Sequence, residues 1–294
     1  MAEAKVNSEA KAEAEKPKPK AKVTKKQLSA AQVILANAEA AKAELGRKYD
    51  ASWLKYYVKI VNKDGDMVPF ALNSIQKQID DKIKELEAQG KPARIIVLKA
   101  RQEGVSTYAQ AKFVCRTIKN PNRNALVVAH RDDSTNSIFE KAKFMNNNLP
   151  DHVKPLQRAS NARELIFDTP ITYKGKQKGL NSKIRVQTAG SEGIGRSDTY
   201  HYVHLSEFAF YSGDPKKALT GILQSVPNKT GTIVIIESTA SGMNSFKDLW
   251  DAAEAGENDF VPMFFPWWAH SEYQMPISDK EKEAWEVYIK HGKT

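Results

Sequence analysis

Apolar strands alternate with helices through most of this chain, and this alternation constrains the fold more than any other feature. The continuous apolar runs 94–98 and 125–129 predict strands buried on both faces, and helix patterns follow them at 105–118 and 134–147. Later strands are expected at 163–168, 183–188, 201–206 and 232–237, with a closing helix near 244–255. This order predicts an α/β fold with a mostly parallel sheet and helices on both faces.

The composition divides the chain into parts. We expect a disordered tail at 1–26, a lead-in at 27–69, the main domain at 70–270, and a C-terminal helical segment, or the start of a linker to a missing domain, at 271–294. The tail is Ala, Lys, Glu and Pro with almost no large apolar side chain. The lead-in predicts a helix over 27–46 and a hairpin whose strands, 57–61 and 67–70, flank an Asp-Gly turn.

The charge and the cysteine content limit the class of protein. The net charge is +10, and the tail supplies +4 of it from eight Lys and four Glu. The basic remainder favours a nucleic-acid partner over a membrane. No apolar run of 18 residues predicts a membrane span, and the charged N-terminus is not a secretory signal. The single Cys115 excludes an intrachain disulfide and a zinc site of several thiolates, and its apolar neighbours predict a buried side chain.

A candidate phosphate-binding loop lies between the first buried strand and its helix. Residues 99–107 read K-A-R-Q-E-G-V-S-T, where backbone N–H groups and a helix N-terminus can bind phosphate. The loop departs from G-x-x-x-x-G-K-[ST], because Val105 stands in the lysine position and Lys99 in that of the first glycine. A lysine at the start of the loop can reach the β- and γ-phosphates from the opposite end. An ordinary strand-to-helix turn is the alternative.

This K-A-R-Q-x-G-x-S-T arrangement resembles the deviant Walker A motif of phage terminase large subunits, the motors that package viral DNA. The resemblance implies a RecA-like (ASCE) P-loop NTPase domain that uses ATP and Mg²⁺. It assigns Lys99 to phosphate binding, Arg101 to charge stabilisation as an arginine finger, and Ser106 to Mg²⁺, which are functions that phosphoryl transfer requires. Nucleotide contacts are expected from Lys99, Gln102, Glu103, Gly104, Val105, Ser106 and Thr107.

Two motifs on either side of the loop extend the resemblance. Gln76, about 25 residues upstream, resembles an adenine-reading Q motif, since its amide both donates and accepts; the polar face of an amphipathic helix is the alternative. Downstream, Y-V-H-L-S-E ends in Glu207 and resembles a Walker B strand, in which the glutamate polarises the attacking water. Ser206 stands in the usual Asp position and is kept as a metal ligand. Because a hydroxyl holds Mg²⁺ more weakly than a carboxylate, either the metal depends on Ser106, the phosphates and water, or ATPase activity is reduced.

A third motif is a buried strand that ends in residues with hydroxyl side chains. Ser238 and Thr239 end the apolar run 232–237 and resemble the coupling motif of terminases, which implies that they sense the γ-phosphate. Before Walker B, Arg196 lies in a Gly-rich loop and is a candidate phosphate sensor in its own or a neighbouring subunit. A polar turn and a surface loop are the respective alternatives.

A basic loop offers a candidate DNA contact. Its lysines, Lys174, Lys176 and Lys178, have a spacing that suits a phosphate backbone followed without base readout, and a solvated hairpin turn is the alternative.

The order of these motifs over 70–246 predicts the ATP-hydrolysing motor domain of a terminase large subunit, which moves double-stranded DNA into a procapsid. The resemblance implies a portal protein and a terminase small subunit as partners, a pentameric ring, the host cytoplasm as location, and no membrane. We find no room for the RNase H-like nuclease domain of such subunits, so no DNA cleavage is expected. The alternatives are another P-loop helicase or translocase, and a degenerate remnant that binds nucleotide without hydrolysing it.

Overall fold

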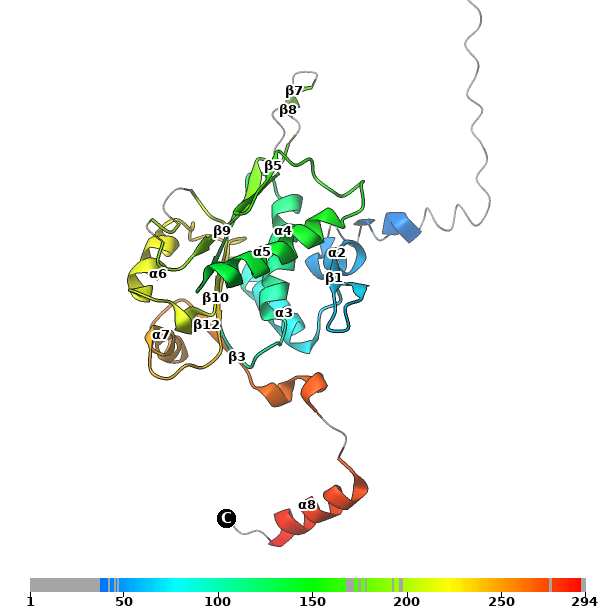
Figure 1. The fold of residues 1–294 in the computed structure, drawn as a ribbon, viewed down its shortest axis with the longest axis vertical. Coiled ribbons are helices and arrows are strands. Elements are labelled where there is room, and N and C mark those ends of the chain that lie inside the picture. Colours follow the sequence, from blue (N-terminus) through cyan, green and yellow to red (C-terminus); the bar gives the residue numbers. More distant parts are fainter. Residues whose placement is uncertain are drawn as a thin grey trace, which may run out of the picture. The chain divides into compact units, whose positions relative to one another are not determined.

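An eight-stranded sheet runs through the fold (Figure 1). The computed structural model describes residues 38–41, 43–44, 46, 48–167, 172–173, 176–177, 179–191, 193–195, 198–274 and 277–291. The strand order is β12-β3-β11-β10-β4-β9-β6-β5. The strands are β3 (Ala93–Lys99), β4 (Asn124–Ala129), β5 (Ala159–Ser160), β6 (Glu164–Phe167), β9 (Ser182–Thr188), β10 (Tyr202–Ser206), β11 (Ile233–Ser238) and β12 (Val261–Phe265). From β12 to β9 all neighbours are parallel, and β6 and β5 add antiparallel pairs, which confirms the predicted mostly parallel sheet.

Side chains of the central strands alternate between two hydrophobic cores, one on each face of the sheet. Ile95 and Val97 of β3 lie in one core, whereas Ile96 lies in the other, and the strands β4, β10 and β11 alternate in the same way. The first core packs against α2 (Asp50–Tyr57), α3 (Ser74–Ala88), α4 (Val105–Lys119) and α5 (Asp132–Asn147). The second packs against η1 (Phe208–Phe210), α6 (Pro215–Gln224) and α7 (Ser245–Glu254). Helices therefore cover both faces, as the continuous apolar runs predict.

Most of the expected elements are present. The strands predicted at 94–98, 125–129, 183–188, 201–206 and 232–237 are β3, β4, β9, β10 and β11. The strand predicted at 163–168 is β6, which runs antiparallel to β9. The predicted hairpin is confirmed as β1 (Lys59–Val61) paired with β2 (Met67–Pro69), although its first strand begins after Tyr57, which is the last residue of α2. The helices α2 and α6 and the strand β12 were not predicted.

Some predictions fall outside the described residues. The tail at 1–26 lies wholly outside them, and the helix predicted over 27–46 lies mostly outside them. The remaining described elements are β7 (Thr172–Tyr173), β8 (Lys176–Gln177), η2 (Trp267–Ala269), η3 (Ser271–Tyr273) and α8 (Asp279–His291). Cys115 is fully buried and burial raises the pKa of its thiol, as expected of a small core side chain. Among the helices of the described residues, none is both long and apolar enough to cross a bilayer.

Candidate nucleotide-binding site

The loop between β3 and α4 ends in a glycine whose backbone conformation would be strained for a residue with a side chain. Gly104, the N-cap of α4, has φ +77°, and a Cβ there would lie 2.6 Å from Gln76 Nε2. Gln102 is also left-handed, with φ 60°. These turns end the loop at the N-terminus of α4, where free backbone N–H groups and the helix dipole favour an anion.

Helix α3 holds this loop through two amide side chains. Asn73 Nδ2 donates to the Glu103 carbonyl at 3.2 Å, and Gln76 Nε2 donates to the Gly104 carbonyl at 2.9 Å. Gln76 Oε1 also accepts from the Asn73 backbone N–H at 3.0 Å, which completes a capping box on α3. The structure thus engages both ends of the Gln76 amide, and reading of adenine by Gln76 stays a prediction.

The predicted phosphate-binding lysine and the predicted catalytic glutamate lie together. Lys99 Nζ is 3.0 Å from Glu207 Oε1 and 3.1 Å from Glu237 Oε2. Burial by itself would lower the pKa of Lys99, but the charges of Glu237 and Glu207 outweigh it and raise the pKa. Lys99 is therefore a fixed positive charge at the start of the loop.

The end of β11 holds Glu207 in place. The Thr239 backbone N–H and hydroxyl each lie 3.2 Å from Glu207 Oε2, and the Ser238 hydroxyl lies 3.4 Å from it. Glu207 follows β10 with φ 53° and ψ 50°, a left-handed conformation that is costly for a residue with a side chain. The residues of the predicted coupling motif are thus hydrogen-bond donors to the predicted catalytic carboxylate.

Glu237 is a site residue that the sequence did not predict. It is fully buried, and Oε1 accepts from the Ser106 hydroxyl at 2.7 Å and from the Ser206 hydroxyl at 2.8 Å, with His204 Nε2 at 3.3 Å. Burial would raise the pKa of Glu237, but the His204 hydrogen bond, the Lys99 charge and the Ser106 hydrogen bond hold it well below the usual range. The sequence does contain a signal for this residue, because an acidic side chain within the apolar run of β11 is unusual.

A cavity of about 790 Å³ opens beside this group of side chains. Its lining includes Lys99, Glu207 and every loop residue from Gln102 to Thr107, together with Gln76. Lys141 of α5 also lines it and was not predicted. Within the loop, Glu103 is buried, and burial raises its pKa to about 7 against the opposing effects of the Lys99 charge and the Ala100 backbone N–H. The size and polar lining suit a nucleotide.

Arg101 is a predicted site residue that does not line this cavity. Its side chain is exposed, so its role as an arginine finger stays a prediction. Arg196, Lys174 and Lys178 lie outside the described residues, and Lys176 lies in β8.

The segment that follows β12 contacts the loop backbone. The Ala100 N–H donates to the Phe265 carbonyl at 3.0 Å, and the Tyr273 hydroxyl donates to the Arg101 carbonyl at 2.9 Å. The chain leaving the sheet is thus hydrogen-bonded to the first half of the loop.

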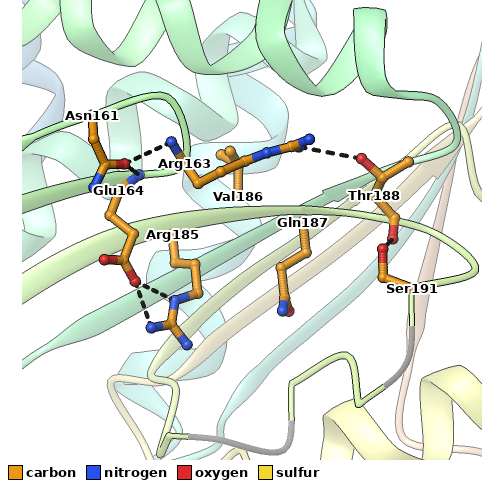
Figure 2. Close-up of a pocket in the computed structure, with 8 residues that line it drawn as sticks. All are labelled: Asn161, Arg163, Glu164, Arg185, Val186, Gln187, Thr188 and Ser191. Carbon is orange, nitrogen blue, oxygen red and sulfur yellow. Dashed lines mark hydrogen bonds and ion pairs between the residues drawn. The ribbon is translucent and has the colours of Figure 1, made fainter.

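A second cavity, of about 500 Å³, lies along β6 and β9 and is lined by two arginines (Figure 2). Both are paired with acids: Arg185 with Glu164 at 2.5 Å, and Arg163 with Asp132 at 3.0 Å. Residues of the phosphate-binding loop do not line this cavity. We therefore place the candidate nucleotide site in the larger cavity.

No family model matches the sequence. Among solved structures, the large terminase ATPase domain of Thermus phage P74-26 is 19% identical, with 75% of this chain and 87% of that chain covered and a TM-score of 0.51. The HK97 bacteriophage large terminase is 15% identical, with 83% and 52% covered and a TM-score of 0.58. The large terminase of a thermophilic bacteriophage, in complex with ADP, is 12% identical, with 73% and 50% covered and a TM-score of 0.50.

These similarities are structural, and they cover most of the chain. The chain spans about half the length of the HK97 large terminase and of the ADP-bound one, and nearly all of the P74-26 ATPase domain. The strand order, the loop before α4 and these neighbours lead to one conclusion: the chain has the α/β fold of the ATPase domain of phage large terminases.

Proposed function

We propose that the chain hydrolyses ATP as the motor domain of a terminase large subunit and moves double-stranded DNA into a procapsid. One observation carries the proposal: Lys99 lies 3.0 Å from Glu207 at a cavity lined by the phosphate-binding loop. A lysine that binds phosphate and a carboxylate that positions the attacking water are two of the groups that phosphoryl transfer to water uses. The fold shared with large terminases supports the step from an ATPase to a packaging motor.

Each group at the cavity then has a task. The N-terminus of α4 and the loop N–H groups bind the phosphates, and Lys99 neutralises charge there. Glu207 orients the attacking water and accepts its proton. Ser238 and Thr239, which contact Glu207, couple its position to the γ-phosphate.

Magnesium fits the oxygen donors of the site. The Ser106 hydroxyl lines the cavity and lies 2.7 Å from a buried carboxylate oxygen of Glu237, and hard oxygen donors are what Mg²⁺ prefers. The metal would neutralise charge on the phosphates. The Ser206 hydroxyl, in the Walker B position, is a further candidate for the metal site.

The wider assembly is part of the same proposal. Double-stranded DNA, a portal protein and a terminase small subunit are the partners, within a pentameric ring in the host cytoplasm. Arg101 and Arg196 would act on nucleotide in their own or a neighbouring subunit, and Lys174, Lys176 and Lys178 would contact the DNA backbone.

An ATPase assay with paired variants tests the enzymatic part. We expect Lys99→Ala to weaken ADP binding and abolish turnover, whereas Glu207→Ala abolishes turnover with ADP affinity largely retained. Arg163→Ala, which removes a cation lining the second cavity, is the matched control and should leave turnover unchanged. ADP binding without turnover in the wild type would instead identify a degenerate remnant, and strand displacement would identify a helicase.

A second assay tests the DNA contact. Lys174, Lys176 and Lys178 are replaced together by Ala, and ATP turnover is measured with and without double-stranded DNA. We expect DNA stimulation to fall while basal turnover stays constant, because the lysines would contact only phosphates. Unchanged stimulation would remove this loop from the DNA-binding surface.

A further inference from the structure

Position 206, where a Walker B strand usually has an aspartate, has the carboxylate of Glu237 beside it on the neighbouring strand. β10 and β11 run in parallel, and their register pairs Ser206 directly with Glu237. Strand alternation places His204, Ser206 and Glu237 on the α4 face of the sheet, since Tyr202 and Ile235 of the same two strands belong to the α4 core. The Ser206 hydroxyl donates to Glu237 at 2.8 Å.

This juxtaposition explains why a hydroxyl stands at position 206. An aspartate at this position would place a second carboxylate beside Glu237, and two ionised carboxylates at such a distance repel. A serine instead supplies a proton to the carboxylate that is already present. The ends of these two strands therefore carry one negative charge between them. The charge is on Glu237 of β11 instead of on residue 206 of β10.

Glu237 also fixes the direction of the Ser106 hydroxyl. A carboxylate only accepts, so the 2.7 Å contact uses the hydroxyl proton of Ser106 and leaves the lone pairs of its oxygen available. Ser106 lines the cavity, whereas Glu237 is fully buried behind it. Glu237 can therefore act on a cation in the cavity through Ser106, as a positioning residue, without being exposed itself.

The local charges leave room for a divalent cation. Lys99 and Lys141, which also lines the cavity, carry two positive charges near the two negative charges of Glu207 and Glu237, so these four groups balance before a polyphosphate enters. A nucleotide adds several further negative charges. An added cation is the means by which such a site accepts phosphates.

We propose that Glu237 performs the task of the absent Walker B aspartate: it orients Ser106 and supplies the negative charge that retains Mg²⁺ at the bound nucleotide. This inference rests on the proposed function, because it presumes that the cavity binds a nucleotide with its metal. It replaces the direct metal contact proposed above for Ser206 with an indirect part, in which Ser206 donates a hydrogen bond to Glu237 and is not a ligand.

The test is ADP affinity measured by calorimetry in EDTA and in Mg²⁺, with Mn²⁺ binding by electron paramagnetic resonance as the second readout. We expect Glu237→Gln to bind ADP in EDTA at least as well as the wild type, but to lose about tenfold or more of the affinity that Mg²⁺ adds. Mn²⁺ binding in the presence of ADP should weaken in parallel. Asp80→Asn, which alters a buried carboxylate remote from the loop, is the control and should retain the Mg²⁺ effect.

A transposed variant separates metal retention from a structural role. Ser206→Asp combined with Glu237→Ser moves the carboxylate back to β10 and should regain much of the Mg²⁺ effect. Ser206→Asp alone should lower the thermal midpoint, since it adds the second carboxylate. Should Glu237→Gln fail to fold, Glu237→Asp keeps the charge, and it is expected to reduce the Mg²⁺ effect with ADP binding in EDTA preserved.

Two results would overturn the inference. One is a full Mg²⁺ effect in Glu237→Gln. The other is loss of the effect without recovery in the folded transposed variant, which would make Glu237 a structural counter-ion of Lys99. In both cases the wild type still binds ADP and the proposed function stands. A wild type that binds no ADP in either condition would refute the proposed function itself.

Discussion

Two groups of charged side chains lie at or along α4, and they differ in whether solvent can reach them. The first, which we call the site group, consists of Lys99, Glu207 and Glu237 before the N-terminus of the helix. The second, the scaffold group, is centred on Lys112 within the helix. Lys112 Nζ lies 2.9 Å from Asp50 and 2.7 Å from Asp80, and its side chain is fully buried.

The scaffold group is held by ion pairs among its own members, and Lys84 pairs with Asp80 at its edge. Lys119 pairs with Asp50 at 2.8 Å, Arg116 pairs with Asp50 and with Glu87, and the Tyr108 hydroxyl donates to Asp80 at 2.8 Å. These contacts tie α2 and α3 to α4. Burial would raise the pKa of Asp50, but Lys112, Arg116 and Lys119 together hold it well below the usual range.

The site group is open. Lys141 is a further cation in the lining of its cavity. The Glu207 side chain is 25% exposed at the cavity and has a strained backbone. Burial of a lysine between two carboxylates therefore does not by itself mark a functional site. What distinguishes the site group is the cavity beside it and the Glu207 carboxylate that solvent reaches there.

The largest effect on stability is expected from the scaffold group. Lys112→Met would leave Asp50 and Asp80 buried without their shared partner, and we expect a loss of about 3–5 kcal/mol in the free energy of unfolding. Lys99→Met should lose less than half of that, because solvent reaches Glu207 through the cavity and the buried Glu237 keeps its hydrogen bonds with Ser106, Ser206 and His204. Urea denaturation of both variants measures the difference. Equal losses would show that the site group is as much a part of the scaffold as the other.

Asp50 of the scaffold group and Glu103 of the loop beside the site group should contribute to the pH dependence of stability with opposite signs. Asp50 has a depressed pKa, so its contribution is present above about pH 4 and is lost as the pH falls further. Glu103 has its pKa raised from 4.5 to about 7, so the folded state binds its proton more tightly and stability falls as the pH rises through that window. Between pH 5 and pH 8 we expect this effect to lower the free energy of unfolding by about 2–3 kcal/mol, and Glu103→Gln should remove that decrease.

The free energy of unfolding at pH 5 and pH 8, for the wild type and Glu103→Gln, checks this prediction. A wild type and variant with the same dependence between these values would mean that Glu103 ionises normally in the loop.

Two glycines with a left-handed backbone allow the same comparison, one in the loop at the site and one remote from it. Gly104→Ala meets both a left-handed φ and Gln76 Nε2 at 2.6 Å, so we expect a loss of about 2 kcal/mol together with weaker ADP binding. Gly90 is the matched control, since its φ is +73° but nothing lies within 4 Å of the position that a Cβ would take. Gly90→Ala should lose about 1 kcal/mol with ADP binding intact. Calorimetry and thermal unfolding provide both measurements, and equal ADP affinities would count against contact of the loop with phosphate.

The smallest effect is expected from an exposed ion pair. Lys77 and Asp81 pair one turn apart on α3, and both are solvent-exposed. Lys77→Ala should change the free energy of unfolding by less than about 0.5 kcal/mol, because solvent screens such pairs. Urea denaturation in parallel with Lys112→Met checks it, and a change above about 1 kcal/mol would undermine the distinction between exposed and buried pairs.

The sequence predicts the alternating elements well, including the loop between β3 and α4, because they depend on local patterns. It does not predict the role of Glu237, which depends on the register that brings β11 against Ser206 of β10. β12 was missed because Pro262 argues against a central strand; β12 is at the edge of the sheet, where proline is tolerated. For α6, the signal was present in Asp214 and Pro215, an N-cap followed by proline at the first position.

Two hydrogen bonds join the loop after β3 to the chain that leaves the sheet. The Ala100 N–H donates to the Phe265 carbonyl, the Tyr273 hydroxyl donates to the Arg101 carbonyl, and β12 lies directly beside β3. A change in the loop backbone must therefore either preserve or break these two contacts. If the loop binds nucleotide as proposed, the conformation of residues 265–273 would then depend on the nucleotide.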